Sequence, residues 1–428
     1  MKVLVVGGGG REHALAWKAA QSPKVDHVYV APGNAGTALE KGIENINIGA
    51  ENIPALLDFA KNNDIGLTIV GPEAPLVLGI VDAFSEAGLK AFGPSRGAAQ
   101  LEGSKAFTKD FLARHHIPTA AYGNFTDEAE AIAYVKQQGA PLVVKADGLA
   151  AGKGVILAHS EDEAISAVRD MLSGNRFGDA GARVVIEEFL FGEEASFICM
   201  VDGRNILPMA TSQDHKARDN GDTGPNTGGM GAYSPAPVVT PEIHDRIMNE
   251  VIRPTVDGMA AEGNDYTGFL YAGVMIDKDG TPKVLEYNVR FGDPETQPIM
   301  MRLKSDLVEH CLAALDGKLD KATADWDERT SIGVVLAAGG YPGDYNKGDI
   351  ISGLDSADNV TTKIFHAGTA EKDGHVVTSG GRVLCVCALG NSVTNAQARA
   401  YEIVKQVSWK YVYYRTDIGH RAIAREKS

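Results

Sequence analysis

The sequence predicts an α/β protein with an open parallel sheet at its N-terminus and further domains behind it. Three observations lead to this prediction. The chain has 428 residues, which is too long for one hydrophobic core and indicates two to four domains. Its first hundred residues alternate short apolar runs with helix-like segments. No run approaches the roughly 20 apolar residues of a membrane span.

The N-terminal hundred residues carry the alternation typical of an open sheet with helices on both faces. The predicted strands cover residues 2–6, 27–30, 67–70 and 90–92, and the predicted helices cover residues 12–20, 53–62 and 77–87. Such sheets bind ligands beyond the carboxyl ends of their strands. The turns GGGG at 7–10, PGNAG at 32–36 and GPE at 71–73 fall there, so we expect a ligand site at these turns.

The rest of the chain divides at about residues 104 and 326. Residues 104–118 predict a helix that leads out of the N-terminal domain, and residues 119–190 predict a smaller unit of βαβ type. A new strand-rich segment begins at residue 331 and ends in a helix at 395–407. We therefore expect an N-terminal domain of residues 1–103, a central domain of residues 104–325 and a C-terminal α+β domain of residues 326–428.

Composition and charge argue against several classes of protein. The formal net charge is −15, whereas dedicated nucleic-acid binders carry basic surfaces. The chain opens directly with an apolar strand and lacks the pattern of a signal peptide. Its cysteines, Cys199, Cys311, Cys385 and Cys387, form no CxxC pair. We expect a cytoplasmic protein with reduced cysteines, no nucleic-acid partner and no membrane contact.

The stretch VLEYNVRFGDPETQP, residues 284–298, indicates a metal and phosphate site. Its first half reads as a strand with Glu286, Asn288 and Arg290 on one face. A solvated sheet face is the ordinary explanation, but Asn is a poor strand former and the stretch continues into Gly-Asp-Pro-Glu. Carboxylate and amide oxygens suit Mg²⁺, and a guanidinium can fork onto a phosphate or a carboxylate. We therefore predict a metal site beside a nucleotide.

The segment VLVVGGGGREHA, residues 3–14, has the strand, glycine turn and helix of a dinucleotide-binding fingerprint but breaks its pattern. Glu12 or His13 stands at the third glycine position, and the second strand ends without an acid for a ribose hydroxyl. The turn still offers backbone N–H groups and the positive end of a helix dipole. A single phosphate is the expected ligand, and a purely structural tight turn is the alternative.

A second glycine-rich loop, VVKADGLAAGKGV at 143–155, is close to a Walker A loop without matching it. Asp147 replaces the first glycine, and Gly154 replaces the Ser or Thr that would hold magnesium. Lys145 ends a strand, and Lys153 lies within the glycine loop. We predict a mobile lid that closes on a triphosphate and excludes water, with a solvated loop lysine as the alternative for Lys153.

These pieces together resemble the ATP-grasp enzymes and, more narrowly, the phosphoribosylamine–glycine ligases, also called glycinamide ribonucleotide synthetases. The wider likeness rests on Lys145, the glycine lid, the strand and hinge VVIEEFLFGEE at 184–194 and the strand at 286–290. The narrower likeness follows the whole chain through GPE at 71–73, LEGSKAF at 101–107, KADGLAAGKG at 145–154, QDHK at 213–216, TGPNTGGMGAY at 223–233, RFGDPETQ at 290–297, AAGGYP at 337–342 and GGRVL at 380–384. Long motifs in this order make the resemblance specific.

The resemblance implies a fold and a reaction. The central domain would have the ATP-grasp fold, with residues 119–190 as a small lid subdomain. The family reaction joins glycine to 5-phosphoribosylamine through glycyl phosphate and gives glycinamide ribonucleotide, ADP and phosphate in purine biosynthesis. It implies ATP as a substrate and Mg²⁺ or Mn²⁺ as the metal. Transient contacts with neighbouring purine-pathway enzymes are a further expectation.

The resemblance also implies a role for each matching residue near the metal. Glu286 and Asn288 would bind the metal ion. Arg290 would stabilise the transferring phosphoryl group. Asp214 and Lys216 would line the glycine site as further catalytic residues, together with the glycine-rich loop at 223–231.

Two further sets of residues are implied for the nucleotide and the other substrate. Glu188–Leu190 would read adenine through the backbone, and Glu194, or less readily Glu193, would accept the ribose hydroxyls. The nucleotide-binding residues would be Lys105, Lys145, Gly152, Lys153, Gly154, Glu187, Glu188, Phe189, Leu190 and Glu194. The substrate-binding residues would be Gly8, Gly9, Gly10, Arg11, Pro32, Gly33, Asn34, Gly71, Pro72, Glu73, Gly292 and Asp293; capping of the loop is the alternative role for Asp293 and for Glu295.

One departure from the wider superfamily and three alternatives belong to this interpretation. The strand before the metal strand, residues 269–276, carries no acid, so a second metal ion would lack an obvious ligand. The nearest alternative is another ATP-grasp ligase or carboxylase acting on a different amine or carboxylate. The broken fingerprint argues against an oxidoreductase. A catalytically inactive ligand sensor would have lost lysines or metal ligands, and none of those is missing here.

Overall fold

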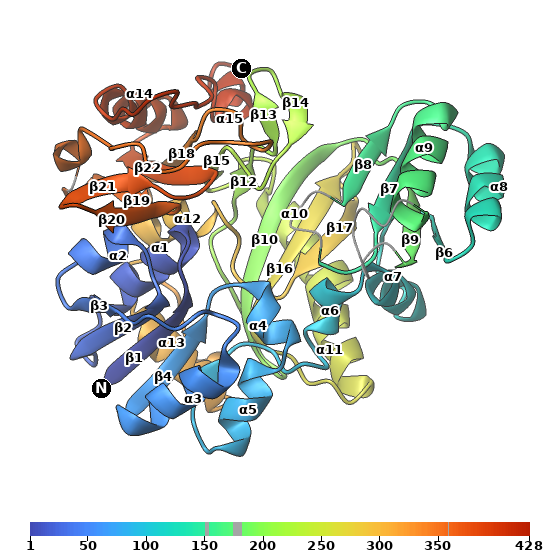
Figure 1. The fold of residues 1–428 in the computed structure, drawn as a ribbon. Coiled ribbons are helices and arrows are strands. Elements are labelled where there is room, and N and C mark those ends of the chain that lie inside the picture. The colour runs from blue at the N-terminus through green and yellow to red at the C-terminus, as the bar shows by residue number, and fades with distance from the viewer. Residues whose placement is uncertain (150–153, 174–181, 358) are drawn as a thin grey trace.

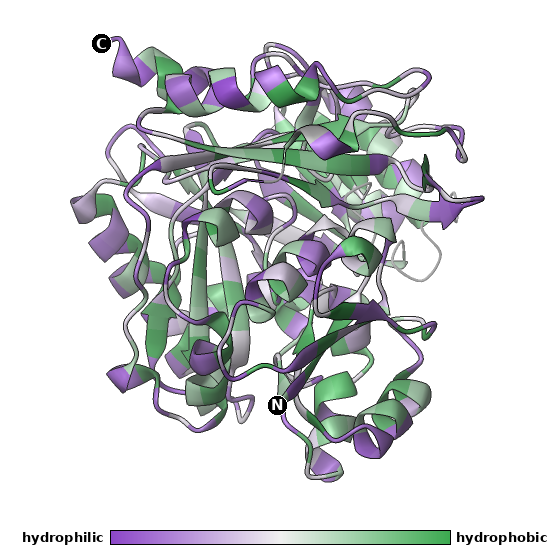
Figure 2. Cartoon of the chain, turned by 90° about the vertical axis from the view of Figure 1, so that its left-hand side faces the viewer, coloured by the Kyte–Doolittle hydropathy of each residue, from purple (hydrophilic) through white to green (hydrophobic). Residues whose placement is uncertain are grey.

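The computed structural model describes residues 1–149, 154–173, 182–357 and 359–428, and Figure 1 shows their arrangement. The N-terminal and C-terminal parts of the chain lie side by side, and a large antiparallel sheet stands between them and a smaller unit on the opposite side. Figure 2 shows hydrophobic strands inside the molecule and hydrophilic residues on the outer helices and loops. Among the described residues, no helix is long and apolar enough to span a membrane.

The N-terminal residues fold into the open parallel sheet that the alternating apolar runs predict. Its strand order is β3-β2-β1-β4-β5, with parallel pairs throughout. Strand β1 lies in the middle, so its run of apolar residues is buried on both faces. The elements are β1 Lys2–Gly7, α1 Gly10–Ala19, β2 His27–Pro32, α2 Ala35–Leu39, β3 Ile43–Asn45, α3 Ile53–Asn62, β4 Ile65–Val70, α4 Glu73–Val77, α5 Ile80–Glu86 and β5 Ala91–Phe92.

The carboxyl ends of β1, β2 and β4 bring the three predicted turns together. Gly7 pairs with Pro32 across β1 and β2, and the N–H of Gly71 donates to the carbonyl oxygen of Val6 at 3.0 Å. Strand β1 has β2 on one side and β4 on the other, so the connections leave in opposite directions and open a crevice there. The turns therefore meet at one edge of the sheet.

Two local features of this domain differ from the sequence expectation. The helix expected at 77–87 is interrupted at Gly79, whose φ of +92° suits a residue without a β-carbon. Helix α4 consequently ends at Val77, and α5 begins at Ile80. The edge strand β3 was not expected, because three residues show too little alternation to indicate a strand.

The central residues form two antiparallel sheets, with the orders β11-β10-β16-β17 and β6-β9-β7-β8. The βαβ connection expected within 119–190 is present but split: β6 and β7 are both antiparallel to β9 and therefore parallel to one another, and β9 lies between them. The elements are α6 Gln100–Gly103, α7 Lys105–Arg114, β6 Tyr122–Phe125, α8 Glu128–Gln138, β7 Leu142–Ala146, β8 Val155–Ala158, α9 Glu161–Leu172, β9 Val184–Glu188, β10 Glu193–Asp202, β11 Ile206–Pro208, α10 Pro241–Ile247, α11 Arg253–Ala261, β16 Thr267–Ile276, β17 Pro282–Asn288, α12 Thr296–Arg302 and α13 Leu307–Leu315, with a π-helical stretch at Met248–Ile252 and a 3₁₀ turn at Leu319–Lys321.

The C-terminal sheet takes its strands from two parts of the chain. Its order is β12-β15-β18-β22-β19, and β12 and β15 come from residues 213–234, inside the range expected for the central domain. Figure 1 shows α14 on one side of this sheet and α12 and α1 on the other. The elements are β12 Gln213–Asp214, β13 Ala217–Asp219, β14 Thr223–Asn226, β15 Gly231–Ser234, β18 Thr330–Ala337, β19 Thr362–His366, β20 Thr369–Lys372, β21 His375–Thr378, β22 Arg382–Gly390, α14 Val393–Val404 and α15 His420–Glu426, with a 3₁₀ turn at Leu354–Ser356.

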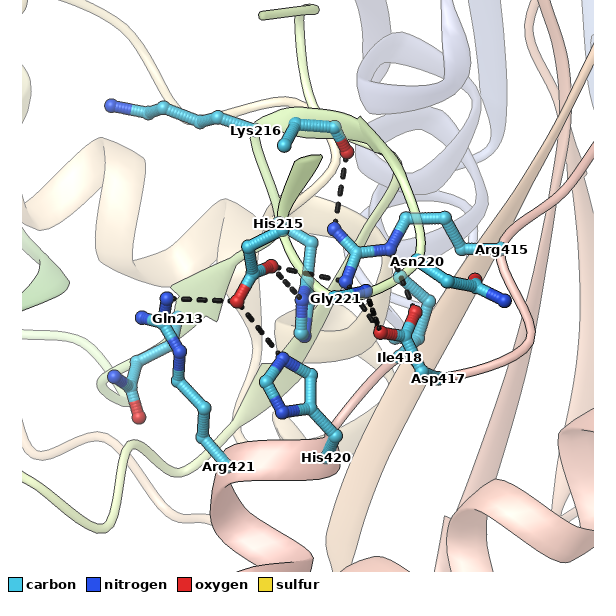
Figure 3. Close-up of polar contacts among 12 residues, drawn as sticks. Gln213, His215, Lys216, Asn220, Gly221, Arg415, Asp417, Ile418, His420 and Arg421 are labelled. Atoms are coloured by element: carbon cyan, nitrogen blue, oxygen red, sulfur yellow. Dashed lines mark hydrogen bonds and ion pairs between the residues drawn. The ribbon is translucent and has the colours of Figure 1, made fainter. Parts of the chain in front are cut away.

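Charged side chains around Asp222 fasten the C-terminal segment to the loops between β12 and β15. Arg415 is fully buried, lies 3.0 Å from the Asp222 carboxylate and donates to the carbonyl oxygen of Ala217 at 3.1 Å. His420 and Arg421 reach the other carboxylate oxygen at 3.0 and 2.9 Å (Figure 3). Because a guanidinium removed from water needs compensation, this network fixes the two segments to one another.

We expect Arg415→Met to lower the free energy of unfolding by about 3 kcal/mol, because it leaves Asp222 without its buried cation. This is the low end of the range for buried pairs, since Asp222 is 26% exposed. Arg421→Met removes a contact to the same carboxylate from a side chain that is 45% exposed, and it should cost at most about 1 kcal/mol. Urea denaturation of the variants measures the difference. Equal losses would contradict the dependence on burial.

Candidate active site

The end of strand β17 presents the polar face expected for residues 286–290. A β-bulge sets this face, because the register of β16 and β17 skips Leu285. Glu286 and Asn288 are partly exposed, whereas Tyr287 between them is buried on the opposite side. Arg290 follows directly after the strand. The bulge therefore places Glu286 and Asn288 on the face of the site. It also leaves the backbone carbonyl of Leu285 without a partner strand residue, so that it can accept a hydrogen bond from elsewhere.

Three lysines from separate parts of the chain surround this face. Lys145, in β7, donates to the carbonyl oxygen of Leu285 at 3.1 Å, the carbonyl that the bulge exposes. Lys105, at the start of α7, donates at 2.8 Å to a backbone carbonyl of the loop after β7. Lys216 lies 3.5 Å from the Glu286 carboxylate. The fold thus brings positive charge from α7, β7 and the connection after β12 to the predicted metal strand.

The charge on Glu286 follows from these neighbours. Burial alone would raise the pKa of Glu286, but Lys216, Lys145 and Lys105 outweigh burial and lower it to about 2. The carboxylate is therefore ionised at neutral pH, as a metal ligand must be. With the amide oxygen of Asn288, it forms a pair of hard oxygen donors.

Arg290 is held between two carboxylates from the N-terminal part of the chain. Its Nε donates to Glu73 at 3.2 Å, and its Nη2 donates to Glu102 at 2.9 Å. Glu102 also accepts the backbone N–H of Val289 at 2.8 Å. Burial raises the pKa of Glu102 to about 7, although Arg290 opposes the rise. The guanidinium therefore joins the metal strand to the turn at 71–73.

The segment expected to form the adenine hinge carries one inward and one outward carboxylate. Glu187 is buried and lies 2.8 Å from the ammonium of Lys145 and 2.9 Å from that of Lys109. Glu188 is exposed, and its carboxylate accepts a backbone N–H from the linker before β6 at 3.2 Å. Residues 189–190 continue from β9 toward β10. The side chain of Glu187 thus belongs to the lysine cluster.

The two acids considered for the ribose have different partners. Arg425 of α15 contacts both carboxylate oxygens of Glu193, at 2.6 and 2.7 Å, and Gln213 donates to Glu193 at 2.9 Å. Glu194 is ion-paired to Lys216, which also faces the metal strand. Glu193 is therefore engaged by the C-terminal helix, and Glu194 is the acid that faces the lysines of the site.

Asp214 and Lys216 lie on one side of an extended segment, and His215 lies on the other. Lys216 contacts Glu194 and Glu286, whereas His215 is buried toward the C-terminal segment. Burial raises the pKa of Asp214 well above its ordinary value, with Lys216 opposing the rise. The structure thus places both expected glycine-site side chains toward the metal strand.

Glu295 lies in a buried polar cluster beside them. Its carboxylate accepts hydrogen bonds from the hydroxyls of Ser196 at 3.0 Å and Tyr271 at 3.1 Å, and burial raises its pKa. The same side chain packs over Gly292, where an added β-carbon would lie 2.4 Å from a carboxylate oxygen. A side chain at position 292 would therefore displace the Glu295 carboxylate.

Asp293 is tied to the C-terminal domain. Arg382 lies 3.5 Å from its carboxylate and donates to its backbone carbonyl at 2.9 Å, and Gln297 donates to the carboxylate at 2.9 Å. Arg382 also donates to the carbonyl oxygen of Gly228 at 2.8 Å. One arginine therefore connects the loop at 290–297 with the glycine-rich loop at 223–231.

The N-terminal glycine turn is packed closely by protein atoms. The N–H of Gly9 donates to the Glu12 carboxylate at 2.7 Å, so an N–H expected to face a phosphate has a partner within the chain. An added β-carbon at Gly8 would lie 2.7 Å from a backbone carbonyl oxygen of the neighbouring turn. One at Gly10 would lie 2.5 Å from the side-chain nitrogen of Gln297. Packing against the backbone therefore requires glycine at position 8, whereas an added β-carbon at position 10 would displace the Gln297 side chain.

Arg11 and Asn34 connect this turn to its surroundings. Arg11 donates to Glu12 at 2.5 Å and to the carbonyl oxygen of Phe291 at 3.3 Å. Asn34 caps α2 and donates to the carbonyl oxygen of Gly8 at 2.9 Å. Both side chains therefore support the crevice at the sheet edge. The same edge holds Pro32, Gly33, Gly71, Pro72 and Glu73.

The predicted lid loop is described only at its ends. Gly152 and Lys153 lie outside the described residues. At the base of the loop, the carbonyl oxygen of Gly154 accepts the N–H of Ala146 at 2.8 Å. The loop thus starts and ends beside Lys145.

His215, Asp222 and His420 form a second group of side chains of metal-ligating type. Their candidate donor atoms lie within 4.8 Å of one another. His215 accepts a backbone N–H through Nε2 at 3.0 Å, and Asp222 is shared by the guanidinium groups of Arg415 and Arg421 (Figure 3). Two guanidinium groups would repel a cation, so the arrangement indicates an ion-pair network and not a metal centre.

Several contributors to the site were not identified from the sequence. Lys109 follows Lys105 by four residues on α7, so helical spacing could have indicated it. Glu102 lies within the motif that drew attention to Lys105, but nothing local distinguishes it. Tyr271 and Arg382 reach the site only through tertiary packing, and of the two only Arg382 lies within a motif of the sequence, GGRVL at 380–384.

Comparison with known proteins agrees with this geometry. Models of the phosphoribosylglycinamide synthetase family match consecutive parts of the chain: the N domain at residues 1–102, the ATP-grasp (A) domain at 103–296 and the C domain at 331–421. The phosphoribosylamine–glycine ligase of Vibrio vulnificus is 71% identical over 427 residues, and that of Escherichia coli is 69% identical over 429 residues. Each alignment covers 100% of both chains.

Solved structures show the same relationship. A crystal structure of phosphoribosylamine–glycine ligase from Thermotoga maritima matches with a TM-score of 0.84 and 35% identity, covering 98% of this chain and 100% of the other. The biotin carboxylase domain of Hydrogenobacter thermophilus 2-oxoglutarate carboxylase matches with a TM-score of 0.74 and 17% identity over 96% of this chain and 91% of that one, a likeness of fold alone. The chain belongs to the phosphoribosylglycinamide synthetase family, and its central domain is of the ATP-grasp type.

Proposed function

We propose that this enzyme joins the carboxylate of glycine to the amino group of 5-phosphoribosylamine in purine biosynthesis, with ATP converted to ADP and phosphate. One observation carries the proposal. Lys105, Lys145 and Lys216 lie around the oxygen donors of β17. Arg290 follows the same strand and contacts Glu73 of the N-terminal crevice. Identities of 69–71% over the full lengths of ligases with this name support the choice of substrates.

The nucleotide would lie between the small sheet and the large sheet. Lys105 and Lys145 now donate to backbone carbonyls, so phosphate oxygens can replace neutral acceptors with charged ones. The backbone at 188–190 would read the base, and Glu194 would accept the ribose hydroxyls. The loop that contains Gly152, Lys153 and Gly154 would close over the phosphates.

The residues at the end of β17 fit a divalent cation. Glu286 is ionised and 38% exposed, and Asn288 adds a neutral oxygen from the same face. Hard oxygen donors of this kind suit Mg²⁺ and Mn²⁺. Bound there, the ion would draw charge from the phosphate oxygens during transfer.

The reaction would proceed in two displacements without a protein nucleophile. First, a glycine carboxylate oxygen forms a bond to the γ-phosphorus, and the bond from that phosphorus to the bridging oxygen breaks, so ADP leaves. Second, the amino nitrogen of phosphoribosylamine attacks the carbonyl carbon of glycyl phosphate, the carbon–oxygen bond to phosphate breaks, and the nitrogen loses a proton. Arg290 would stabilise the transferring group, while Asp214 and Lys216 would hold the glycine moiety.

Phosphoribosylamine would bind at the edge of the N-terminal sheet. Helix α1 begins at Gly10, and the positive end of its dipole points to the crevice. Residues 8–11, Asn34 and the turn at 71–73 would surround the sugar phosphate, with Gly292 and Asp293 on the opposite side. The ion pair between Arg290 and Glu73 supports this placement, because it links the phosphoryl-transfer site directly to the crevice.

An ATP-grasp ligase or carboxylase that acts on another amine or carboxylate is the alternative function. The likeness to biotin carboxylases concerns the fold and supplies no argument for their substrates. A cytoplasmic location, the lack of nucleic-acid and membrane partners and contacts with neighbouring purine-pathway enzymes stay predictions, as does the division into domains at about residues 104 and 326.

The proposed reaction is tested by omitting each substrate in turn. Phosphate release from ATP should require both glycine and freshly prepared phosphoribosylamine, because the second displacement clears the site for another turnover. Replacing phosphoribosylamine with bicarbonate or ammonia should leave release at the background rate. Full activity with another acceptor and none with phosphoribosylamine would contradict the proposal.

The metal site is tested by Glu286→Gln, which keeps the shape of the side chain and removes its charge. We expect kcat to fall about 1,000-fold, since metal-assisted charge stabilisation contributes several kcal/mol. Asn288→Ala should raise the magnesium concentration needed for half-maximal activity. The control is Glu250→Gln, which removes a carboxylate that pairs with Arg246 away from the site. A Glu286→Gln enzyme with normal turnover at low magnesium would remove this residue from the metal site.

A further inference from the structure

Lys109 is a buried lysine that has no role in the reaction outlined above. It lies on α7, one helical turn after Lys105, and its side chain is 3% exposed. An ammonium group at this depth costs free energy unless it has charged or hydrogen-bonding partners. The partners of Lys109 therefore indicate what it does.

Those partners connect Lys109 to the proposed nucleotide site. Its ammonium lies 2.9 Å from one carboxylate oxygen of Glu187, and the other oxygen of Glu187 lies 2.8 Å from the ammonium of Lys145. Lys109 also donates to the hydroxyl of Thr119 at 2.6 Å, and that hydroxyl donates to the carbonyl oxygen of Val284 at 2.6 Å. One carboxylate thus lies between two ammonium groups.

Lys109 changes the net charge of the buried group that it forms with Glu187 and Lys145. Lys145 and Glu187 alone would form a neutral pair, and a neutral pair attracts a polyphosphate weakly. With Lys109 included, the three side chains carry a net charge of about +1 when all are ionised. The cluster is nearly closed to solvent, so its net charge is screened less than that of a surface group.

The ionisation of the cluster agrees with this count. Burial lowers the pKa of Lys109 to about 8, with Glu187 opposing the fall, so the ammonium is mostly protonated at neutral pH. Burial would raise the pKa of Glu187, but Lys145 and Lys109 outweigh burial and lower it.

We propose that Lys109 is a positioning residue that neutralises Glu187, so that the charge of Lys145 is left for the phosphates of the nucleotide. The inference rests on the proposed nucleotide site at Lys145. It makes the role of Lys109 electrostatic and indirect: Lys109 touches Glu187, Glu187 touches Lys145, and Lys145 meets the phosphate.

The test compares a nucleotide, which carries phosphates, with its nucleoside, which carries none. Dissociation constants of ADP with magnesium and of adenosine are measured by calorimetry or competition for the full-length enzyme. We expect Lys109→Met to weaken ADP binding about 10- to 50-fold, which is roughly one to two units of log K. Adenosine binding should stay within about 3-fold of the wild type. Normal ADP binding by Lys109→Met, or an equal loss for adenosine, would overturn the proposal.

A second substitution separates charge balance from packing. Lys109→Met combined with Glu187→Gln removes one positive and one negative charge, so the net charge returns to about +1. The double variant should regain most of the lost ratio of ADP to adenosine affinity. A double variant as weak as Lys109→Met alone would assign a packing role to Lys109 and overturn the charge account.

Two further variants cover the case in which Lys109→Met does not fold and test whether the hydroxyl of Thr119, which lies between Lys109 and Val284, affects nucleotide binding. If Lys109→Met does not fold, Glu187→Gln alone is decisive: it should keep or raise the ratio of ADP to adenosine affinity, and a lowered ratio would overturn the proposal. Thr119→Val removes the hydroxyl between Lys109 and Val284 without changing charge, and it should leave the ratio unchanged; a loss equal to that of Lys109→Met would also overturn it. A wild-type enzyme that binds neither ligand would instead contradict the proposed function.

Discussion

A charged group that is removed from water needs an opposite charge or hydrogen-bond partners. This requirement determines the contacts between the different parts of the chain. Between the N-terminal crevice and β17, Arg290 lies between Glu73 and Glu102. Between the small and the large sheet, Glu187 lies between two lysines. Between the central loops and the C-terminal segment, Asp222 lies among arginine and histidine side chains. The parts of the chain are thus joined by polar networks beside the places where the substrates would bind.

The same networks prepare the site for highly charged substrates. Lys216 balances Glu194 and Glu286, and the other lysines at β17 donate to backbone carbonyls. Binding of a nucleotide and a divalent ion would exchange these internal partners for phosphate and metal, with little rearrangement of the backbone. Catalysis would then come from positioned charges, as expected for a phosphoryl transfer in which the protein forms no covalent bond to the substrate.

Local signals in the sequence predicted local structure well. Helix α3 has the predicted bounds, because Asn52 caps an amphipathic segment. The insertion of β9 between β6 and β7 has no such signal, because strand order is decided by packing across the unit. The site divides in the same way: Glu286 and Asn288 stand out on one strand, whereas the approach of Arg382 to the loop at 290–297 depends on how two domains dock.

The proposed glycyl phosphate would form at β17 and would be consumed at the N-terminal crevice. The most direct test starts from glycine labelled with ¹⁸O in its carboxylate and follows the label during turnover with ATP and phosphoribosylamine. Because one carboxylate oxygen becomes the bridge to phosphorus, each released phosphate should carry one ¹⁸O atom, and the amide product should keep the other. Released phosphate without ¹⁸O, together with a labelled amide product, would show that the glycine carboxylate does not attack the γ-phosphorus and would contradict the account.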